Sequence, residues 1–174
     1  MPPLFVSAII DRTTGRPYVS PLQREARLQG TAQTLYHQTS PENAKAILKS
    51  GIMLPGSGGL AGGGIYFATT DTDTDHKALS HGVVLVADVR LGQVLTINRN
   101  GDSTITFESL QRRGYDSVLI PRTGGREYVV YHPDQVSNIR VFAQRPTPIH
   151  ASGPNPNGRF RGPEEHLPSG TCNF

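Results

Sequence analysis

The chain has little cysteine and no long apolar run. Its single cysteine, Cys172, cannot form an internal disulfide or a cysteine-rich zinc site, which favours a reducing, intracellular setting, cytoplasmic or nuclear. No stretch approaches the roughly 18 consecutive apolar residues that a membrane span requires. The first residues also lack the charged start and apolar core of a signal peptide. A soluble protein with no membrane partner is therefore expected.

The charge of the chain gives little indication of a partner. The 17 basic and 14 acidic residues leave a formal net charge of +3. No run of about five or more like charges is present, so the basic stripe typical of nucleic-acid-binding proteins is missing. The charge permits a nucleic-acid partner without indicating one.

A glycine-rich segment, PGSGGLAGGG, covers residues 55–64. Its GSGGLA part matches a dinucleotide-binding fingerprint, in which a strand precedes the glycines and a helix follows them. Here Pro55 precedes the glycines and a strand pattern, IYFAT, follows them. The context therefore disfavours a Rossmann-type site, and we expect a flexible loop.

No metal site is expected from the sequence. Asp71, Asp73 and Asp75 have the spacing of the start of a calcium loop, but His76 and Gly82 stand where the loop needs a glycine and a bidentate glutamate. The six histidines include no pair at the helical spacing, beside a glutamate, of a zinc protease. A solvated loop or a short capped helix is expected around the three aspartates.

The pattern of the chain predicts one α+β domain between two extensions. Residues 145–174 hold 6 of the 14 prolines and 4 glycines without any periodicity, which predicts a flexible tail. Residues 1–30 are predicted to form an N-terminal extension, with a short strand and a short helix, at the domain edge. Between residues 31 and 144, many β-branched runs and two convincing helices, at 41–50 and within 106–114, predict a mostly antiparallel sheet with few short helices.

Three predicted strands each carry one chemically capable side chain. In REYVVY, the alternation of a strand puts Glu127, Val129 and Tyr131 on one face. An acid among bulky apolar groups is costly unless it has a function. Any one of the three side chains taken alone is more often structural, and only their combination indicates a function. The three segments are LYHQTS (35–40) with His37, GGGIYFA (62–68) with Tyr66, and GREYVVYHPDQV (125–136) with Glu127.

Together with VVLVADVRLG and YDSV, these segments resemble the catalytic domain of the poly(ADP-ribose) polymerase family, the diphtheria-toxin-like ADP-ribosyltransferases with a His-Tyr-Glu triad. The resemblance covers residues 31–144. It implies a split, mostly antiparallel β fold that binds NAD as cosubstrate, without a metal, in a crevice between its sheets. His37 would bind the adenosine ribose, Tyr66 would stack on the nicotinamide ring, and Glu127 would bind the nicotinamide ribose and support catalysis.

The resemblance also implies further NAD contacts beside the triad. Gln38 stands where the family usually has a glycine whose backbone binds the nicotinamide amide, and Thr74 stands at a nicotinamide-binding serine. Lys77 replaces the second stacking tyrosine, so the neighbouring ring of His76 is the candidate for that side of the nicotinamide. The cofactor-binding set implied in this way is His37, Gln38, Thr39, Gly64, Tyr66, Thr74 and His76.

These matches predict an NAD-dependent ADP-ribosyltransferase that transfers ADP-ribose to a protein or nucleic-acid acceptor and releases nicotinamide. Asp73 falls where chain-elongating members carry lysine, which favours transfer of a single ADP-ribose. One alternative is an NAD glycohydrolase, which needs the same triad. Another is a catalytically silent module that binds NAD or ADP-ribose, which Gln38 and Lys77 favour and the intact triad disfavours.

Overall fold

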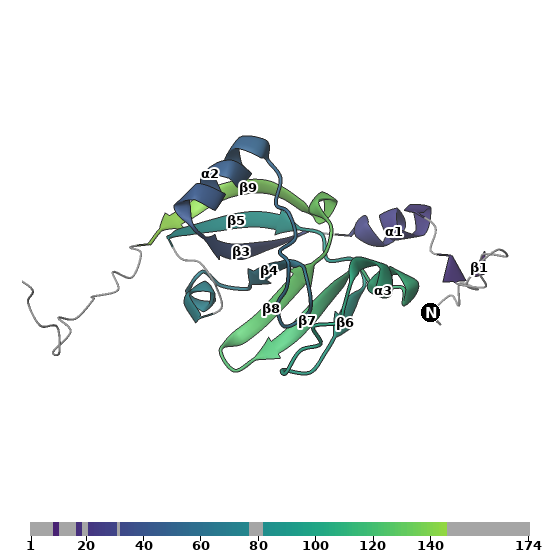
Figure 1. Cartoon of the computed structure of the whole chain (residues 1–174). Coiled ribbons are helices and arrows are strands. Elements are labelled where there is room, and N and C mark those ends of the chain that lie inside the picture. Colours follow the sequence, from purple (N-terminus) through teal and green to yellow (C-terminus); the bar gives the residue numbers. More distant parts are fainter. Residues whose placement is uncertain (1–8, 11–16, 19–20, 31, 77–81, 146–174) are drawn as a thin grey trace, which may run out of the picture.

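The computed structural model describes residues 9–10, 17–18, 21–30, 32–76 and 82–145 and has a mixed α+β fold (Figure 1). The predicted tail, apart from Arg145, lies outside the described residues, as do Lys77 and Cys172. The described helices are α1 (Pro21–Leu28), α2 (Pro41–Ser50) and α3 (Phe107–Arg112), with short 3-10 helices η1 (Thr72–His76) and η2 (Pro133–Gln135). The strands are β1 (Ile9–Ile10), β2 (Pro17–Tyr18), β3 (Gln33–Thr39), β4 (Ile65–Ala68), β5 (Val83–Val89), β6 (Val94–Thr96), β7 (Ser117–Arg122), β8 (Gly125–Val130) and β9 (Val136–Gln144).

Seven of these strands form one sheet in the order β6-β7-β8-β4-β3-β5-β9. Its neighbouring strands are antiparallel except for β6 and β7, so the predicted mostly antiparallel sheet with few helices is confirmed. Strand β3 pairs with β5 along its whole length but pairs with β4 only at Tyr36 and Ala68. The sheet therefore has two halves that diverge beyond this single pair.

Helix α2 covers the β3-β5-β9 half of the sheet, and both of its ends follow from local sequence (Figure 1). The Ser40 hydroxyl accepts a hydrogen bond from the Asn43 backbone N–H at 3.2 Å, and Pro41 occupies the first helical turn. Gly51 ends the helix in the left-handed conformation, with φ of 71°, and its N–H donates to the Ile47 carbonyl. The predicted helix at 41–50 is confirmed.

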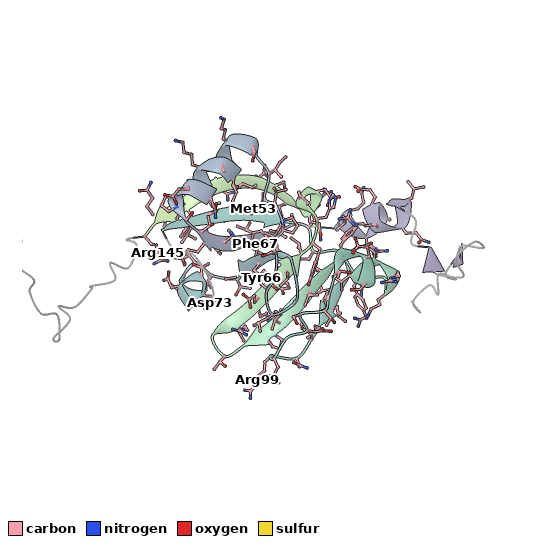
Figure 2. The ribbon with its side chains drawn as sticks, in the orientation of Figure 1. Met53, Tyr66, Phe67, Asp73, Arg99 and Arg145 are labelled. Carbon is pink, nitrogen blue, oxygen red and sulfur yellow. The ribbon has the colours of Figure 1, made fainter. Side chains whose placement is uncertain are left out.

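Two apolar cores are packed on the sheet, and the alternation of β8 connects them. Tyr128 and Val130 belong to the first core, whereas Val129 and Tyr131 belong to the second. Figure 2 labels Met53 and Phe67, both in the first core, one above the other beneath α2. Because side chains alternate along a strand, Glu127 lies on the face of the second core, as its sequence pattern predicts. The second core contains Ala61, Ile105, Leu110, Val118, Ile120, Val129 and Tyr131.

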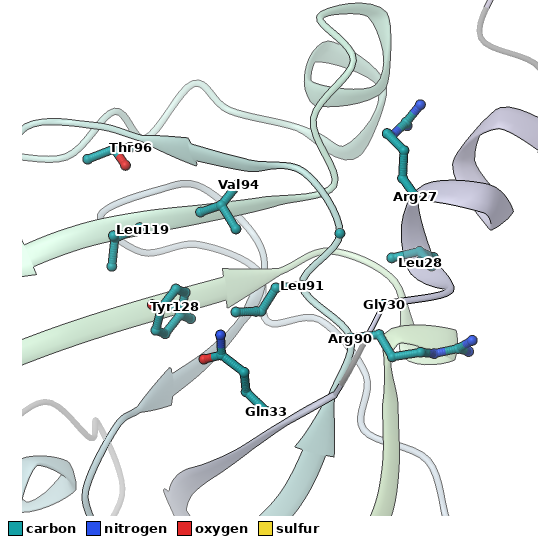
Figure 3. A pocket seen from close by; sticks show the side chains of 11 residues that line it. Arg27, Leu28, Gly30, Gln33, Arg90, Leu91, Val94, Thr96, Leu119 and Tyr128 are labelled. Atoms are coloured by element: carbon teal, nitrogen blue, oxygen red, sulfur yellow. The ribbon is translucent and has the colours of Figure 1, made fainter. Parts of the chain in front are cut away.

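Helix α1, from the predicted N-terminal extension, packs against the sheet domain. Leu28 is buried at its C-terminal end. A cavity of about 290 Å³ lies beside Leu28, with Arg27, Arg90 and Tyr128 in its wall (Figure 3). None of the predicted site residues lines this cavity.

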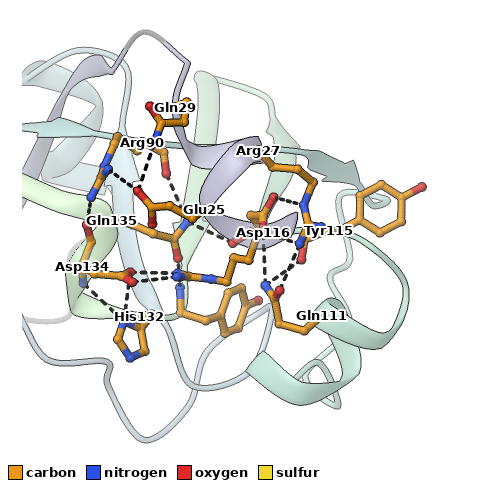
Figure 4. A network of polar contacts seen from close by, with 12 residues as sticks. Glu25, Arg27, Gln29, Arg90, Gln111, Tyr115, Asp116, His132, Asp134 and Gln135 are labelled. Carbon is orange, nitrogen blue, oxygen red and sulfur yellow. Dashed lines mark hydrogen bonds and ion pairs between the residues drawn. The ribbon is translucent and has the colours of Figure 1, made fainter. Parts of the chain in front are cut away.

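A polar network attaches α1 to the domain (Figure 4). Arg24 donates from both terminal nitrogens to the Asp134 carboxylate at 2.6 and 2.8 Å. Arg27 donates from Nε and Nη2 to the buried Asp116 carboxylate at 2.8 and 2.9 Å. The buried amide of Gln135 donates to the carbonyls of Arg90 and Asp116 and accepts from the Tyr131 N–H. The terminal nitrogens of Arg24, the Nε and Nη2 of Arg27 and the side-chain amide of Gln135 therefore all make hydrogen bonds within the fold.

Candidate NAD-binding site

A cavity of about 1080 Å³ opens where β3 and β4 diverge. Residues of β3, α2, the 52–60 segment and β4 line it, together with Arg122 of β7 and Glu127 of β8. Small-molecule pockets occupy roughly 300–1,000 Å³, so this cavity has room for a ligand as large as a dinucleotide. His37, Tyr66 and Glu127 all lie in its wall, although they come from three strands.

His37 is fixed by a hydrogen bond across the gap between the sheet halves. Its Nδ1 lies 2.8 Å from the Tyr66 carbonyl oxygen. A carbonyl only accepts hydrogen bonds, so Nδ1 carries the proton. Burial lowers the pKa of His37 from its ordinary value of 6.5, and the ring is therefore neutral at pH 7. In this tautomer Nε2 has a lone pair with which it can accept a hydrogen bond from a ligand hydroxyl.

Tyr66 is held by its hydroxyl, which leaves the orientation of the ring little freedom. The hydroxyl donates to the Gly62 carbonyl at 2.7 Å and accepts from the Ala61 N–H at 2.8 Å. Burial raises the pKa of this hydroxyl, and the charge of Glu127 raises it further. The hydroxyl thus stays protonated at neutral pH, and the ring is a fixed part of the cavity wall.

The glycine-rich segment, which contains no named helix or strand, is connected to its surroundings by backbone hydrogen bonds and holds the Tyr66 hydroxyl. The Gly56 N–H donates to Gly64, and the Asp102 N–H donates to the Leu60 carbonyl. Gly59 lies so close to Tyr66 that a Cβ there would come within 2.3 Å of the phenolic oxygen. The segment continues into β4 and not into a helix, so the Rossmann interpretation is excluded by the structure as well as by the sequence context.

Glu127 is only 5% exposed although it lines the cavity. Its register partners on the neighbouring strands are Ile120 and the small Ala68. Arg122 is the diagonal neighbour of Glu127 on the same face, and its Nε lies 3.7 Å from Glu127 Oε2. Gly125 is the register partner of Arg122, and the Asp73 carboxylate lies over this glycine, in the space that a Cβ would fill. Glu127 thus has a cationic neighbour at the cavity wall.

Sequence reasoning missed Arg122. The signal that could have found it is the short hairpin of PRTGGRE, in which the turn brings residue 122 back beside residue 127. Strand alternation then places both side chains on one face.

The predicted contacts at Gln38 and Thr74 are joined to each other. With its amide nitrogen assigned to face these acceptors, Gln38 donates to the Thr74 carbonyl at 3.1 Å and to Thr74 Oγ1 and Asp75 Oδ1 at 3.2 Å. The Thr74 hydroxyl in turn donates to the Asp71 carbonyl at 2.5 Å. Thr74 therefore offers a ligand an acceptor and no donor, and the Gln38 side chain serves to hold η1 against β3.

Of the remaining predicted cofactor-binding residues, the structure describes Thr39 and Gly64 in full but not the side chain of His76. Thr39 and Gly64 line the cavity. Gly64 also has a packing role, because a Cβ there would lie 2.4 Å from Val129 Cγ1. His76 is the last residue of η1, but its side chain, like all of Lys77, lies outside the described residues. The second side of the proposed nicotinamide site thus stays a prediction.

In the described part of the chain, no three or more His, Cys, Asp or Glu side chains gather as metal ligands. Two of the aspartates with calcium-loop spacing, Asp71 and Asp75, form ion pairs with Arg145 instead. Across the same residues, every helix is too short or too polar to cross a membrane.

Protein-family models and curated proteins were both compared with the chain, and neither comparison gives a match. The likeness to ADP-ribosyltransferases is therefore one of sequence motifs within residues 31–144.

Proposed function

We propose that this protein is an NAD-dependent ADP-ribosyltransferase that transfers a single ADP-ribose to a protein or nucleic-acid acceptor and releases nicotinamide. The observation that carries the proposal is that His37, Tyr66 and Glu127, from three different strands, line one cavity of suitable size. The divergence of the sheet between β3 and β4 is compatible with the split sheet of the ADP-ribosyltransferase fold. The sequence motifs of residues 31–144 support the same assignment.

Binding of NAD follows from the hydrogen-bonding state of each side chain. The Nε2 lone pair of neutral His37 accepts a hydrogen bond from a ribose hydroxyl. The clamped ring of Tyr66 stacks on the flat nicotinamide. Thr74, whose own proton is committed to Asp71, accepts a hydrogen bond from the nicotinamide amide N–H. Each side chain thus contacts NAD through a lone pair or ring face that is not already used in a hydrogen bond within the fold.

The chemistry centres on Glu127. When the bond from ribose C1′ to the nicotinamide nitrogen breaks, both electrons leave with neutral nicotinamide, and the ribose becomes an oxocarbenium-like cation. A carboxylate beside this cation stabilises charge that is present only in the transition state, so it accelerates the reaction. The acceptor oxygen or nitrogen then bonds to C1′, and Glu127 takes up the proton that the acceptor loses.

Purified full-length protein with labelled NAD tests the proposal by following free nicotinamide and labelled acceptor. We expect Glu127→Gln to lower kcat by about a hundredfold or more, which is the scale for loss of one electrostatic stabiliser of a transition state. Binding of NAD should be affected less, because the contact strengthens as the ribose becomes cationic. Glu108→Gln, which removes an exposed acid of α3, is the matched control and should retain wild-type turnover.

Each contrary result has a specific meaning. Nicotinamide release without labelled acceptor identifies an NAD glycohydrolase. NAD binding without nicotinamide release identifies a silent binding module. Wild-type turnover by Glu127→Gln contradicts the role given to Glu127.

A further inference from the structure

One cation stands out among the residues that line the large cavity. In the described part of the chain, Arg122 is the single arginine or lysine in its wall. The side chain of Arg122 is 32% exposed, so its charge is partly shielded from solvent and screened less than that of a surface arginine. Any anionic group of a ligand in this cavity would meet its positive charge here.

The guanidinium of Arg122 is used differently from those that attach α1. Arg24 and Arg27 each place two nitrogens within 2.6–2.9 Å of a carboxylate, which is the geometry of a filled fork. Arg122 has only its Nε near a carboxylate, and the 3.7 Å distance to Glu127 is too long for a hydrogen bond. Among the described residues, neither terminal nitrogen of Arg122 has a protein acceptor. The Arg122 fork is therefore available to a ligand.

We propose that Arg122 is an oxyanion-binding residue of the cavity, whose guanidinium donates hydrogen bonds to a phosphate or carboxylate of the molecule bound beside Glu127. A planar fork is suited to both groups because it can donate two parallel hydrogen bonds to their oxygens. The identity of that molecule rests on the proposed function, whereas the oxyanion site itself does not. Within that function the oxyanion has two sources, the pyrophosphate of the dinucleotide and an acidic group of the acceptor.

The pyrophosphate source is tested with ligands that the enzyme cannot cleave. Adenosine, ADP and ADP-ribose are titrated into wild-type full-length protein, Arg122→Gln and Arg122→Lys by calorimetry. Loss of charge-assisted hydrogen bonds should weaken ADP and ADP-ribose roughly 10- to 100-fold in Arg122→Gln and leave adenosine unchanged. Arg122→Lys should recover part of the loss, because it restores the charge without the fork. Arg99→Gln, which removes the same charge from an exposed position outside the cavity, should bind all three ligands like wild type.

The acceptor source is tested with the same variants in the transfer reaction, using matched acidic and neutral acceptor peptides. If the oxyanion belongs to the acceptor, Arg122→Gln binds ADP-ribose normally but loses roughly 10- to 100-fold in transfer to the acidic peptide relative to the neutral one. Either this pattern or the phosphate-dependent loss of binding supports the oxyanion site.

Two results with the Arg122 variants overturn it. If Arg122→Gln lowers kcat but retains all binding constants and the acceptor preference, then Arg122 is only the counter-ion of Glu127. If Arg122→Gln behaves like wild type in both assays, Arg122 has no role with ligands. Should wild-type protein bind none of the nucleotides, the proposed function fails, and titration with inorganic pyrophosphate decides the oxyanion site separately. Pyrophosphate binding that Arg122→Gln loses supports the site, and its absence in wild type overturns the site.

Discussion

The attachment of α1 and the large cavity use the same kinds of polar side chain in opposite ways. At α1, the forks of Arg24 and Arg27 are filled, and the Gln135 amide makes three hydrogen bonds to backbone groups. At the cavity, His37 uses one ring nitrogen, and Arg122 lies 3.7 Å from its carboxylate neighbour. Most polar groups that serve the fold are paired because an unpaired buried group costs free energy, and the buried Nε of Arg24 is an exception at α1. Hydrogen-bonding capacity that remains unused at a cavity wall is therefore a sign of ligand binding.

The largest effect expected from this comparison is on stability, at the α1 attachment. Asp116→Ala removes a buried carboxylate that accepts from Arg27, Gln93 and Gln111, and should lower the free energy of unfolding by about 3 kcal/mol. Chemical denaturation measures this loss. Turnover per folded molecule should stay at the wild-type level, because Asp116 is outside the cavity wall.

Asp134, the more exposed carboxylate that pairs with Arg24, provides the contrast. Asp134→Ala breaks an ion pair whose carboxylate is 39% exposed, and should cost only about 1 kcal/mol. Equal losses for Asp116→Ala and Asp134→Ala would contradict the importance given to burial. Loss of specific activity in folded Asp116→Ala would show that the two regions are coupled.

The next effect concerns the pH dependence of ligand binding through His37. Because the pKa of His37 is lowered, Nε2 stays unprotonated and can accept a hydrogen bond from pH 8 to about 6.5. At lower pH the ring is protonated, and Nε2 becomes a donor. ADP-ribose affinity should thus be constant above pH 6.5 and fall by up to about tenfold below the lowered pKa. In His37→Gln, whose amide does not titrate in this range, calorimetry should give a much flatter profile. Weakening of wild-type binding as pH rises from 6.5 to 8 would contradict the assigned tautomer.

The same shift has a consequence for stability. Because the folded protein takes up the His37 proton less readily than the unfolded chain, the unfolded state binds more protons between the lowered pKa and 6.5. The contribution of His37 to stability is therefore fully present above pH 6.5 and is lost as the pH falls through this window. Thermal unfolding at several pH values should show a smaller decrease on acidification for His37→Gln than for wild type.

The smallest effect is expected at Arg145, which holds η1 near the cavity. Its side chain pairs with Asp71 at 2.8 Å and with Asp75 at 3.3 Å, and its N–H donates to the Gly82 carbonyl at 2.7 Å. A chain that ends at Gln144 should therefore be about 1 kcal/mol less stable than one that ends at Arg145. Denaturation of the two chains tests this, with the full-length protein as reference. Equal stability would show that these pairs add nothing.

Much of the local structure is determined by the sequence alone. Ser40, Pro41 and Gly51 specify the ends of α2 through contacts that reach no more than four residues along the chain. The alternation of REYVVY assigns Glu127 to the face of the second core, because successive side chains of any strand point to opposite sides. Local hydrogen bonds and the period of a strand do not depend on distant partners, so both features were predictable.

The assembly of the site was decided only by the tertiary structure. The single pair between Tyr36 and Ala68 opens the cavity and brings His37 to the Tyr66 carbonyl. The side-chain amide of Gln38 is directed to Thr74 in η1. These contacts join segments about thirty or more residues apart, so they depend on how the strands pair and how two cores pack on opposite faces of the sheet. Periodicity and capping specify each strand or helix by itself, whereas the width of the gap between β3 and β4 is a property of the whole fold.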